Sequence, residues 1–370
     1  MGKNGFAVVI PVYKKVPDLL EKLGLERISK TFRDRDMFLC MPNGLDAYWY
    51  EKNFKNIKIC RFEDEYFFGL DSYNRMMLNI SFYQKWLRFG YEKILICQLD
   101  VYVISDRLND FFDLPYDYIG APIFRLECDK PFLYGGNGGF SLRSLYPCMN
   151  TLEKHSNLLK DWGENEDEFF SYCGEKFPKE FRVAPLHYSS LFAFDRFARI
   201  LYKYNQGHLP IALHGWYSYD PAFSMEVLRM DEKMRNICAL EDIRKYEEER
   251  FLSFVSNHQP VILYGAGLWG KVFFHFLCKH NISVHCFAVS DNHVPGENYH
   301  GVEVRCLSEL TDDHLVDGMV FSVSRRFMGD ALFSDIVRRV KNMGYVYCFE
   351  PNVVLFNLSV ESWLEAEDVF

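Results

Sequence analysis

Apolar runs and segments with helical spacing alternate along the first hundred residues of the chain. Residues 6–12 form an almost continuous apolar run, which is typical of a strand buried on both faces of a parallel sheet. Shorter apolar runs at 37–41 and 57–60 are separated by helix-spaced segments at 18–30 and 47–54. This alternation predicts a doubly wound α/β sheet.

The ends of the predicted strands carry the first candidate binding residues, because ligands of such sheets sit at the carboxyl ends of the strands. Pro11 and Tyr13 follow the first strand, and Gln98 and Asp100 end the apolar run 93–100. A carboxylate at the end of a buried strand needs a cation, a donor or water. Asp100 is therefore a candidate to hold a metal or a ribose, and a turn or cap role is the alternative.

Residues 71–88 have the spacing of one long helix, with Asn74 and Arg75 in its first turn. This helix is predicted to lead directly into the strand that ends at Asp100.

A glycine-rich stretch, 133–144, is followed by an acidic run at 164–168. Its four glycines predict a loop whose backbone passes close to a flat polar ligand, and the candidate contacts are Gly135, Gly136 and Asn137. The acidic run is flanked by Trp162 and by Phe169-Phe170, so its carboxylates are not all expected to be exposed to solvent. We therefore predict that the chemical centre includes this run.

A histidine follows the short apolar run 209–213. His214 precedes Gly215 and Trp216, and an imidazole in such a place can ligate a metal. A hydrogen-bonded structural histidine is the alternative.

The last third of the chain begins a second β-α-β pattern. After the polar, helix-prone residues 224–254, a strand leads into Gly265-x-Gly267-x-x-Gly270 and a helix, with Asp291 about twenty positions further on. This is the dinucleotide-binding fingerprint in its required context, although the same turn also serves simple strand-to-helix packing. The predicted organisation is a first domain at 1–222, a helical linker at 223–257 and a Rossmann-like domain of unknown ligand at 258–370.

Composition narrows the classes of partner. The formal net charge of -9 argues against a nucleic-acid partner, whose phosphates need a basic face. The 11 Cys include no Cys-x-x-Cys pair, so neither a zinc ribbon nor a disulfide framework is indicated, and a cytoplasmic location is expected. Apolar runs are too short for a signal peptide or a membrane span, which leaves a peripheral membrane contact open.

The order of motifs in the first domain resembles that of GT-A glycosyltransferases. The similarity is greatest to β-1,4-galactosyltransferases, and 133–170 also resembles an uncharacterised family of glycosyltransferase-like domains. The second domain resembles the Rossmann-like modules attached to bacterial polysaccharide-synthesis enzymes. The resemblance of the first domain covers roughly residues 6–220 and rests on these motifs in order: Tyr73-Asn74-Arg75, Cys97-Gln98-Leu99-Asp100, Gly135-Gly136, 139–143, Trp162-Gly163 with 166–168, and His214.

This resemblance implies a role for each motif. Asn74 and Arg75 would contact the nucleotide, Asp100 and His214 would hold Mn²⁺ or Mg²⁺, and Asp167 would be the catalytic base, with Glu166 as the second candidate. Gln98 stands where the family has the first Asp of its metal motif. This motif therefore has only one carboxylate, that of Asp100, with which to bind the metal.

The expected function is transfer of a sugar, with inversion, from a nucleotide-sugar donor to an acceptor hydroxyl in polysaccharide or glycan synthesis. The donor is expected to be a UDP-sugar, and the acceptor a saccharide, a glycoprotein or a lipid-linked glycan. One alternative is a NAD-binding nucleotide-sugar oxidoreductase or epimerase that uses Gly265, Gly267 and Gly270, although no Tyr-x-x-x-Lys pair follows them. The other is a non-catalytic saccharide-binding protein.

Overall fold

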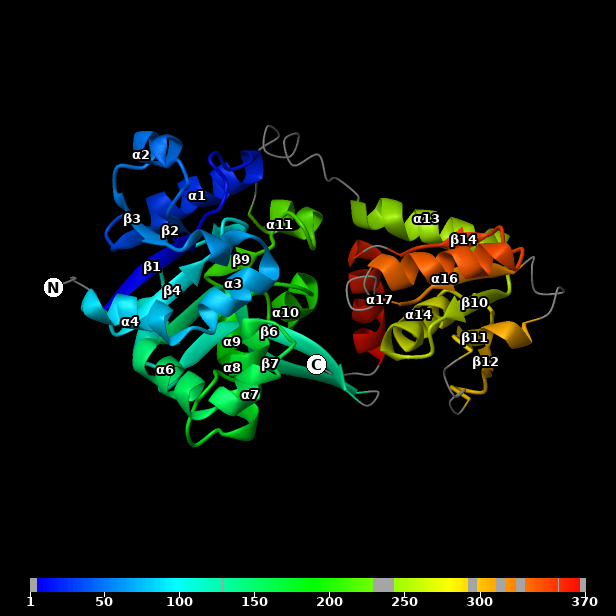
Figure 1. The fold of residues 1–370 in the computed structure, drawn as a ribbon. Coiled ribbons are helices and arrows are strands. Elements are labelled where there is room, and N and C mark those ends of the chain that lie inside the picture. The colour runs from blue at the N-terminus through cyan, green and yellow to red at the C-terminus, as the bar shows by residue number, and fades with distance from the viewer. Residues whose placement is uncertain are drawn as a thin grey trace. The chain divides into compact units, whose positions relative to one another are not determined.

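The structure, a computed structural model, describes residues 5–127, 130–228, 243–291, 298–310, 317–323, 330–351 and 353–366 (Figure 1). The chain divides into two compact units. Unit 1 comprises Met1–Arg125 and Phe132–Ala239, and unit 2 comprises Leu126–Pro131 and Leu240–Phe370.

Unit 1 is built on a six-stranded sheet in the order β3-β2-β1-β4-β7-β6. Strands β1 to β4 pair in parallel, and β7 runs antiparallel to β4. The α/β prediction for this part of the chain is confirmed. The strands are β1 (Phe6–Pro11), β2 (Met37–Pro42), β3 (Ile57–Phe62), β4 (Lys93–Cys97), β6 (Tyr118–Glu127) and β7 (Lys130–Ser144).

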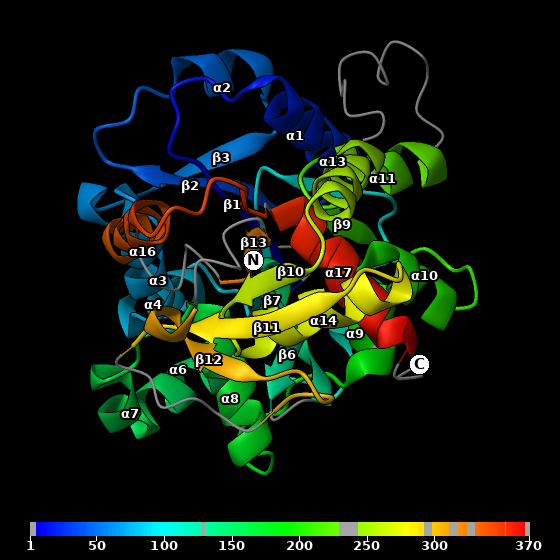
Figure 2. The ribbon, with the colours of Figure 1, turned by 90° about the vertical axis from the view of Figure 1, so that its right-hand side faces the viewer.

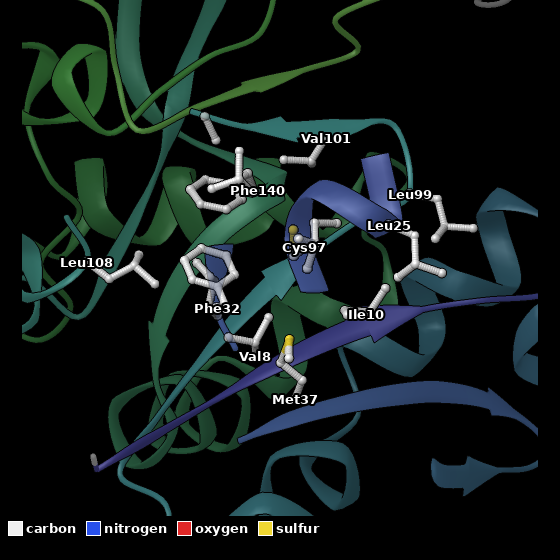
Figure 3. Packing of buried hydrophobic residues seen from close by; sticks show 14 of the residues in the cluster. Val8, Ile10, Leu25, Phe32, Met37, Cys97, Leu99, Val101, Leu108 and Phe140 are labelled. Carbon is white, nitrogen blue, oxygen red and sulfur yellow. The ribbon is translucent and has the colours of Figure 1, made fainter. Parts of the chain in front are cut away.

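Helices cover both faces of this sheet. Val8 and Ile10 of β1 pack with Leu25 of α1 (Leu19–Thr31) on one face (Figure 3). Ala7 and Val9 point to the other face, because successive strand residues alternate. Both faces are buried, which is why the strand is a continuous apolar run. The helices of the second face are α3 (Leu70–Met77), α4 (Ile80–Arg88), α6 (Leu145–Lys154) and α8 (Glu166–Lys176).

The prediction of one helix over 71–88 is wrong, because the helix is interrupted between α3 and α4. Asn79 caps α4 by accepting a hydrogen bond from the Ser81 backbone N–H at 2.9 Å. Its side-chain amide also donates to the Tyr66 hydroxyl at 3.0 Å. A side chain of this type satisfies the free donors of a helix start, so it ends one helical segment and begins the next.

The glycine-rich stretch is also not the predicted loop, because it lies inside β7. Gln98 donates its backbone N–H to the carbonyl of Gly139 at 2.9 Å, which continues the pairing of Cys97 with Phe140. The glycines are needed for close packing instead. A Cβ on Gly136 would lie 2.1 Å from the Ser171 hydroxyl of α8.

A small sheet in the order β5-β9-β8 completes the core of unit 1. It consists of β5 (Val101–Val103), β9 (Ala212–His214) and β8 (Ala193–Phe194). The other helices described in this unit are α2 (Tyr48–Asn53), η1 (Asp64–Phe67), α5 (Asn109–Phe112), α7 (Ser156–Lys160), α9 (Leu186–Phe192), α10 (Ala198–Tyr204) and α11 (Pro221–Val227).

Unit 2 contains a parallel sheet in the order β12-β11-β10-β13-β14, of which β10, β11 and β12 lie side by side in Figure 2. Helices α13 (Ile243–Asn257) and α14 (Leu268–Lys279) both pack against α17 (Val353–Ala366). The predicted linker, 223–257, thus holds the end of α11 and all of α13, and its residues 229–242 lie outside the described part. The remaining elements are β10 (Val261–Tyr264), β11 (Val284–Val289), β12 (Val304–Cys306), β13 (Gly318–Phe321), β14 (Cys348–Phe349), η2 (Leu307–Glu309) and α16 (Asp330–Asn342).

Among the helices that the structure describes, none combines the length and the apolar character needed to cross a bilayer.

Candidate active site

A cavity of about 410 Å³ opens at the carboxyl ends of β1 and β4. Four of the predicted binding residues line it, namely Pro11, Tyr13, Gln98 and Asp100. This is the edge where the sheet rule places a ligand. The other lining residues are Glu21, Tyr66, Phe67, Gly69, Leu70, Tyr73, Leu99 and Tyr217.

His214 lies beside this cavity although it is more than a hundred residues from Asp100. Strand β9 pairs with β5 so that His214 is opposite Val101, and this register brings its ring to the end of β4. The Nε2 atom of His214 is 3.4 Å from Asp100 Oδ1 and 3.2 Å from Gln98 Oε1.

A second carboxylate, which the sequence interpretation missed, contacts the other nitrogen of the same ring. Asp195 Oδ1 lies 3.1 Å from the Nδ1 atom of His214, and both residues are buried. Asp195 follows β8, whose Ala193 and Phe194 pair in parallel with β9. Its position directly after a strand is the same signal that singled out Asp100, but a strand of two residues is too short for the apolar pattern to show it.

Asn137 holds this carboxylate in place. Its amide nitrogen donates to Asp195 Oδ2 at 3.1 Å, and its amide oxygen accepts from the backbone N–H of Gly139 at 3.0 Å. The described contacts of Asn137 thus lie within the protein, and its predicted ligand contact stays a prediction. Gly139 is required beside it, because a Cβ there would lie 2.1 Å from His214 Nε2.

The two carboxylates control the charge of the histidine. Burial alone would lower the pKa of His214, but Asp100 and Asp195 together raise this pKa well above its ordinary value. Burial likewise works to raise the pKa of Asp100, and the His214 imidazole outweighs it, so the Asp100 carboxylate stays ionised. Both contacts therefore favour the protonated form of the ring.

The same donor atoms fit a divalent cation. Within the described residues no group of three or more His, Cys, Asp and Glu side chains converges, so the third donor here is the amide oxygen of Gln98. His214 Nε2 lies 3.2 Å from Gln98 Oε1 and 3.4 Å from Asp100 Oδ1, so these three oxygen and nitrogen donors are close enough together that they would hold one divalent cation. Asp195 on Nδ1 supplies the carboxylate that commonly orients a metal-binding histidine.

The last three residues of the acidic run, 166–168, form the first turn of α8, where their carboxylates have different surroundings. Asp167 is half-buried and accepts hydrogen bonds from the backbone N–H groups of Gly138 and Glu168, both at 2.9 Å. Glu166 is buried and directs both oxygens at Arg143, at 2.7 and 2.9 Å. The charge of Glu166 is thus already offset by a buried arginine, whereas Asp167 has no such partner among its described contacts, so the candidate base is Asp167.

Burial and the neighbouring charge of Glu166 raise the pKa of Asp167 from 3.8 to about 7, against the opposing effect of the Gly138 N–H. A carboxylate with such a pKa is a stronger proton acceptor than a surface aspartate. Asn165, not Asp167, is the N-cap of α8. Asn165 makes no side-chain capping hydrogen bond, however, and Asp167 accepts from the Glu168 N–H of the first turn, so a helix-capping role for Asp167 stands as the alternative to its role as the base.

This pKa predicts a pH-dependent effect of Asp167 on stability. The folded protein keeps the proton up to about pH 7, whereas the unfolded chain loses it near 3.8. The stability associated with the protonated carboxyl is therefore present below about pH 4 and is lost as the pH rises to about 7. Asp167→Asn, which is neutral at every pH, should unfold at a higher temperature than the parent protein at pH 8 and at nearly the same temperature at pH 4. Scanning calorimetry at both pH values checks this, and an equal difference at the two would contradict it.

Asn74 and Arg75 do not line the cavity. The side chain of Asn74 bridges the start of α8, since it donates to Asn165 Oδ1 at 3.2 Å and accepts from the Glu166 backbone N–H at 3.3 Å. Arg75 is exposed on α3. Gly135 and Gly136 lie within β7.

The glycine fingerprint of unit 2 lies between β10 and α14 as the pattern predicts. Gly265 has a φ of +114°, and a Cβ on Gly270 would collide with the Gly265 carbonyl oxygen at 1.9 Å. Gly267 is the N-cap of α14. Asp291, which would bind a ribose in a dinucleotide fold, accepts from the Ser308 N–H at 2.8 Å and pairs with Arg339 at 2.6 Å. These contacts explain the glycine motif as a tight turn in which strand β10 and helix α14 pack closely.

Comparisons with known proteins give the following similarities. A family model described as a protein of unknown function (DUF5672) matches residues 56–214. No curated protein matches the chain. The matched solved structures include GT-A glycosyltransferases, the class that the motif order resembles.

Three of these structures show how similar the matches are in sequence identity, TM-score and coverage. Mouse xyloside xylosyltransferase 1 has 14% identity and a TM-score of 0.40, over 57% of this chain and 97% of that one. The galactosyltransferase LgtC, in complex with donor and acceptor sugar analogs, has 13% identity and a TM-score of 0.36, over 62% and 99%. The glycosyltransferase GlyE of Streptococcus pneumoniae has 11% identity and a TM-score of 0.37, over 91% and 99%.

Proposed function

We propose that unit 1 is a glycosyltransferase that moves a sugar, with inversion, from a nucleotide-sugar donor to a hydroxyl group of a saccharide or glycoconjugate acceptor. The observation that carries the proposal is one continuous arrangement at the carboxyl ends of β1 and β4. Asp100 lines a cavity of about 410 Å³ and pairs with His214. Asp167 does not line this cavity, but it is held by Gly138 of β7, next to Gly139, which packs against His214.

The cavity suits the nucleotide part of a donor. Its walls combine aromatic rings, among them Tyr13 and Tyr73, with the polar groups of Gln98 and Asp100. Ligand pockets are commonly built in this way, with an apolar lining and a few polar groups that fix orientation. A uridine diphosphate sugar is the donor that we assign to it.

The leaving diphosphate needs its developing charge offset. Asp100, His214 and the amide oxygen of Gln98 would hold Mn²⁺ or Mg²⁺, and a cation bound there supplies that positive charge. Asp195, whose Oδ1 lies 3.1 Å from Nδ1, would favour the ring orientation that leaves Nε2 directed at Asp100.

The acceptor hydroxyl needs a base. Asp167, with a pKa of about 7, is ionised in a useful fraction of molecules near neutral pH and can take the proton as the hydroxyl attacks the anomeric carbon. Direct attack on the face opposite the leaving group inverts the anomeric configuration.

Titration calorimetry with UDP, GDP and NAD, each with and without Mn²⁺, tests the donor. We expect UDP to bind in the presence of Mn²⁺ and Tyr13→Ala to weaken this binding by about tenfold, since losing a stacking aromatic ring costs about 1–3 kcal/mol. The matched control is Tyr146→Ala, another exposed tyrosine, on α6 and outside the cavity. Binding of NAD alone would favour the oxidoreductase, and UDP binding without sugar transfer to any acceptor would favour the saccharide-binding protein.

A further inference from the structure

Arg143 and Glu166 form an ion pair in the interior of unit 1. The side chain of Arg143 is 0% exposed and that of Glu166 is 3% exposed. Nη1 and Nη2 of Arg143 contact the two oxygens of Glu166 at 2.7 and 2.9 Å. The pair joins β7 to the first residue of α8.

Every side of the guanidinium is occupied. It donates to the Ser141 and Tyr83 hydroxyls at 2.9 and 3.2 Å, and it lies over the ring of Tyr118 at 4.8 Å and over that of Phe170 at 5.8 Å. Such a group has one available orientation. It therefore fixes the orientation of the carboxylate with which it pairs.

Stability alone is a weak explanation for this pair. Removing two charges from water costs several kcal/mol for each ion, and buried pairs can often be replaced by apolar residues without loss. The same interior holds many apolar and aromatic side chains, including Phe169 and Phe170. A requirement for exact geometry explains a buried pair better than a requirement for stability.

The contacts close into a ring that includes the proposed base. Arg143 Nη2 also reaches the carbonyl oxygen of Gly138 at 3.4 Å, and the N–H of the same glycine donates to Asp167 at 2.9 Å. Asp167 follows Glu166 in the chain, and the ion pair of Glu166 with Arg143 closes the ring of contacts. A Cβ on Gly138 would lie 2.3 Å from Glu166 Oε1 and 2.9 Å from Arg143 Nη2, so the ring closes only around glycine.

We propose that Arg143 is a positioning residue, which acts through Glu166 to hold the Asp167 carboxylate in its place for proton transfer. This inference rests on the proposed role of Asp167 as the base. The pair has an electrostatic consequence as well. The ionised groups near Asp167 are Glu166 and Glu168 on its own helix and Arg143 on β7, while the Tyr118 hydroxyl is a neutral neighbour from β6.

The test uses Glu166→Gln and Arg143→Lys in the full chain. Gln keeps the shape but loses the charge, and Lys keeps the charge but loses the fork that grips both oxygens. We expect each variant to lower kcat by about tenfold to a hundredfold, as a misplaced catalytic group does, with KM for the donor within about twofold.

A second readout separates positioning from structural support. In Glu166→Gln the negative neighbour of Asp167 is gone and Arg143 is left without its partner, and both changes lower the pKa of Asp167. The acidic limb of the kcat–pH profile should therefore move down by about one unit, and the carboxyl ¹³C resonance of Asp167 should titrate at the same lower pH. A purely structural pair would leave both midpoints unchanged.

Asp220→Asn is the matched control. Asp220 is also a buried carboxylate, and it pairs with Arg199 at 2.8 Å and caps α11, a role that Asn can also fill. It should lower the unfolding temperature without changing kcat or the pH profile. Glu166→Gln and Arg143→Lys variants that fold, are less stable and keep the parent kcat and pH profile would overturn the proposal.

Asp167→Asn, measured alongside, distinguishes the two hypotheses. If it loses turnover while Glu166→Gln and Arg143→Lys do not, only the positioning role is overturned. If Asp167→Asn itself keeps normal turnover, the role of Asp167 as base fails and the positioning role fails with it.

Discussion

Asp167→Asn is expected to lower turnover by about a hundredfold or more, the usual scale for the loss of a general base, and to leave donor binding nearly intact. Asn has the shape of Asp and keeps an oxygen that can accept the Gly138 N–H, now made to Asp167 at 2.9 Å. It cannot take a proton from the acceptor hydroxyl. The measurement is kcat with the true donor and acceptor, together with calorimetric binding of the donor nucleotide.

Glu168→Gln is the matched control for this prediction. Glu168 is the next residue of α8 and is also half-buried, but consecutive helical positions point about 100° apart. We expect it to keep turnover within about threefold. Near-normal transfer by Asp167→Asn would eliminate Asp167 as the base and would leave a base-free retaining mechanism to be tested.

Asp100→Asn is expected to weaken Mn²⁺ binding by at least about a hundredfold, and with it the binding of UDP that depends on Mn²⁺. The carboxylate is the single negative ligand in the proposed set, because the other two donors are neutral, His214 Nε2 and Gln98 Oε1. Loss even of a group that only orients a ligand commonly costs 10–100-fold in metal affinity. Calorimetry and the electron paramagnetic resonance signal of free Mn²⁺ measure the affinity directly.

Two further variants make this test specific. His214→Ala removes the second ligand and should have an effect of similar size. Asp113→Asn removes an exposed carboxylate at the end of α5 and should leave Mn²⁺ affinity unchanged. Unchanged Mn²⁺ affinity in both Asp100→Asn and His214→Ala would show that these residues are not the metal ligands.

In the proposed metal site, Asp195 would compensate for the missing second carboxylate of the metal motif. Its Oδ1 lies 3.1 Å from Nδ1 of His214, where it would raise the electron density that the imidazole offers a cation at Nε2. Asp195 follows β8 and does not belong to the end of β4, so the local motif around Gln98 does not show it.

Local sequence patterns were sufficient for the sheet and for the edge that holds the cavity. The continuous apolar run of β1 predicts a strand buried on both faces, and the structure buries Ala7 and Val9 on one face and Val8 and Ile10 on the other. Once a parallel sheet is predicted, the residues that follow its strands share one edge. Pro11, Tyr13, Gln98 and Asp100 could therefore be assigned to that edge without a structure, and all four line the cavity, whereas residues 63–65, which follow the third strand and are assigned to the edge by the same rule, do not.

Two errors arose where a local pattern had more than one structural meaning. Clustered glycines are typical of loops, but they also allow a strand to pack closely against a helix, as β7 does against α8. Helical spacing over 71–88 continues across Asn79, whose capping contacts to Ser81 and Tyr66 interrupt the helix. In both cases the deciding contact comes from outside the segment.

The sequence by itself determined the α/β class of unit 1, the strand–glycine–helix turn of unit 2 and the residues at the strand ends, because each of these depends on neighbours within a few positions. Only the tertiary structure decided the roles within the acidic run and around the histidine. Glu166 is neutralised by Arg143, whose side chain reaches it across 23 positions of sequence, and this leaves Asp167 as the candidate base. Asp195 meets His214 because β8 and β9 are neighbours in a small sheet. Burial and pairing of charges depend on which distant segments share an interior, and no local pattern of residue types contains that information.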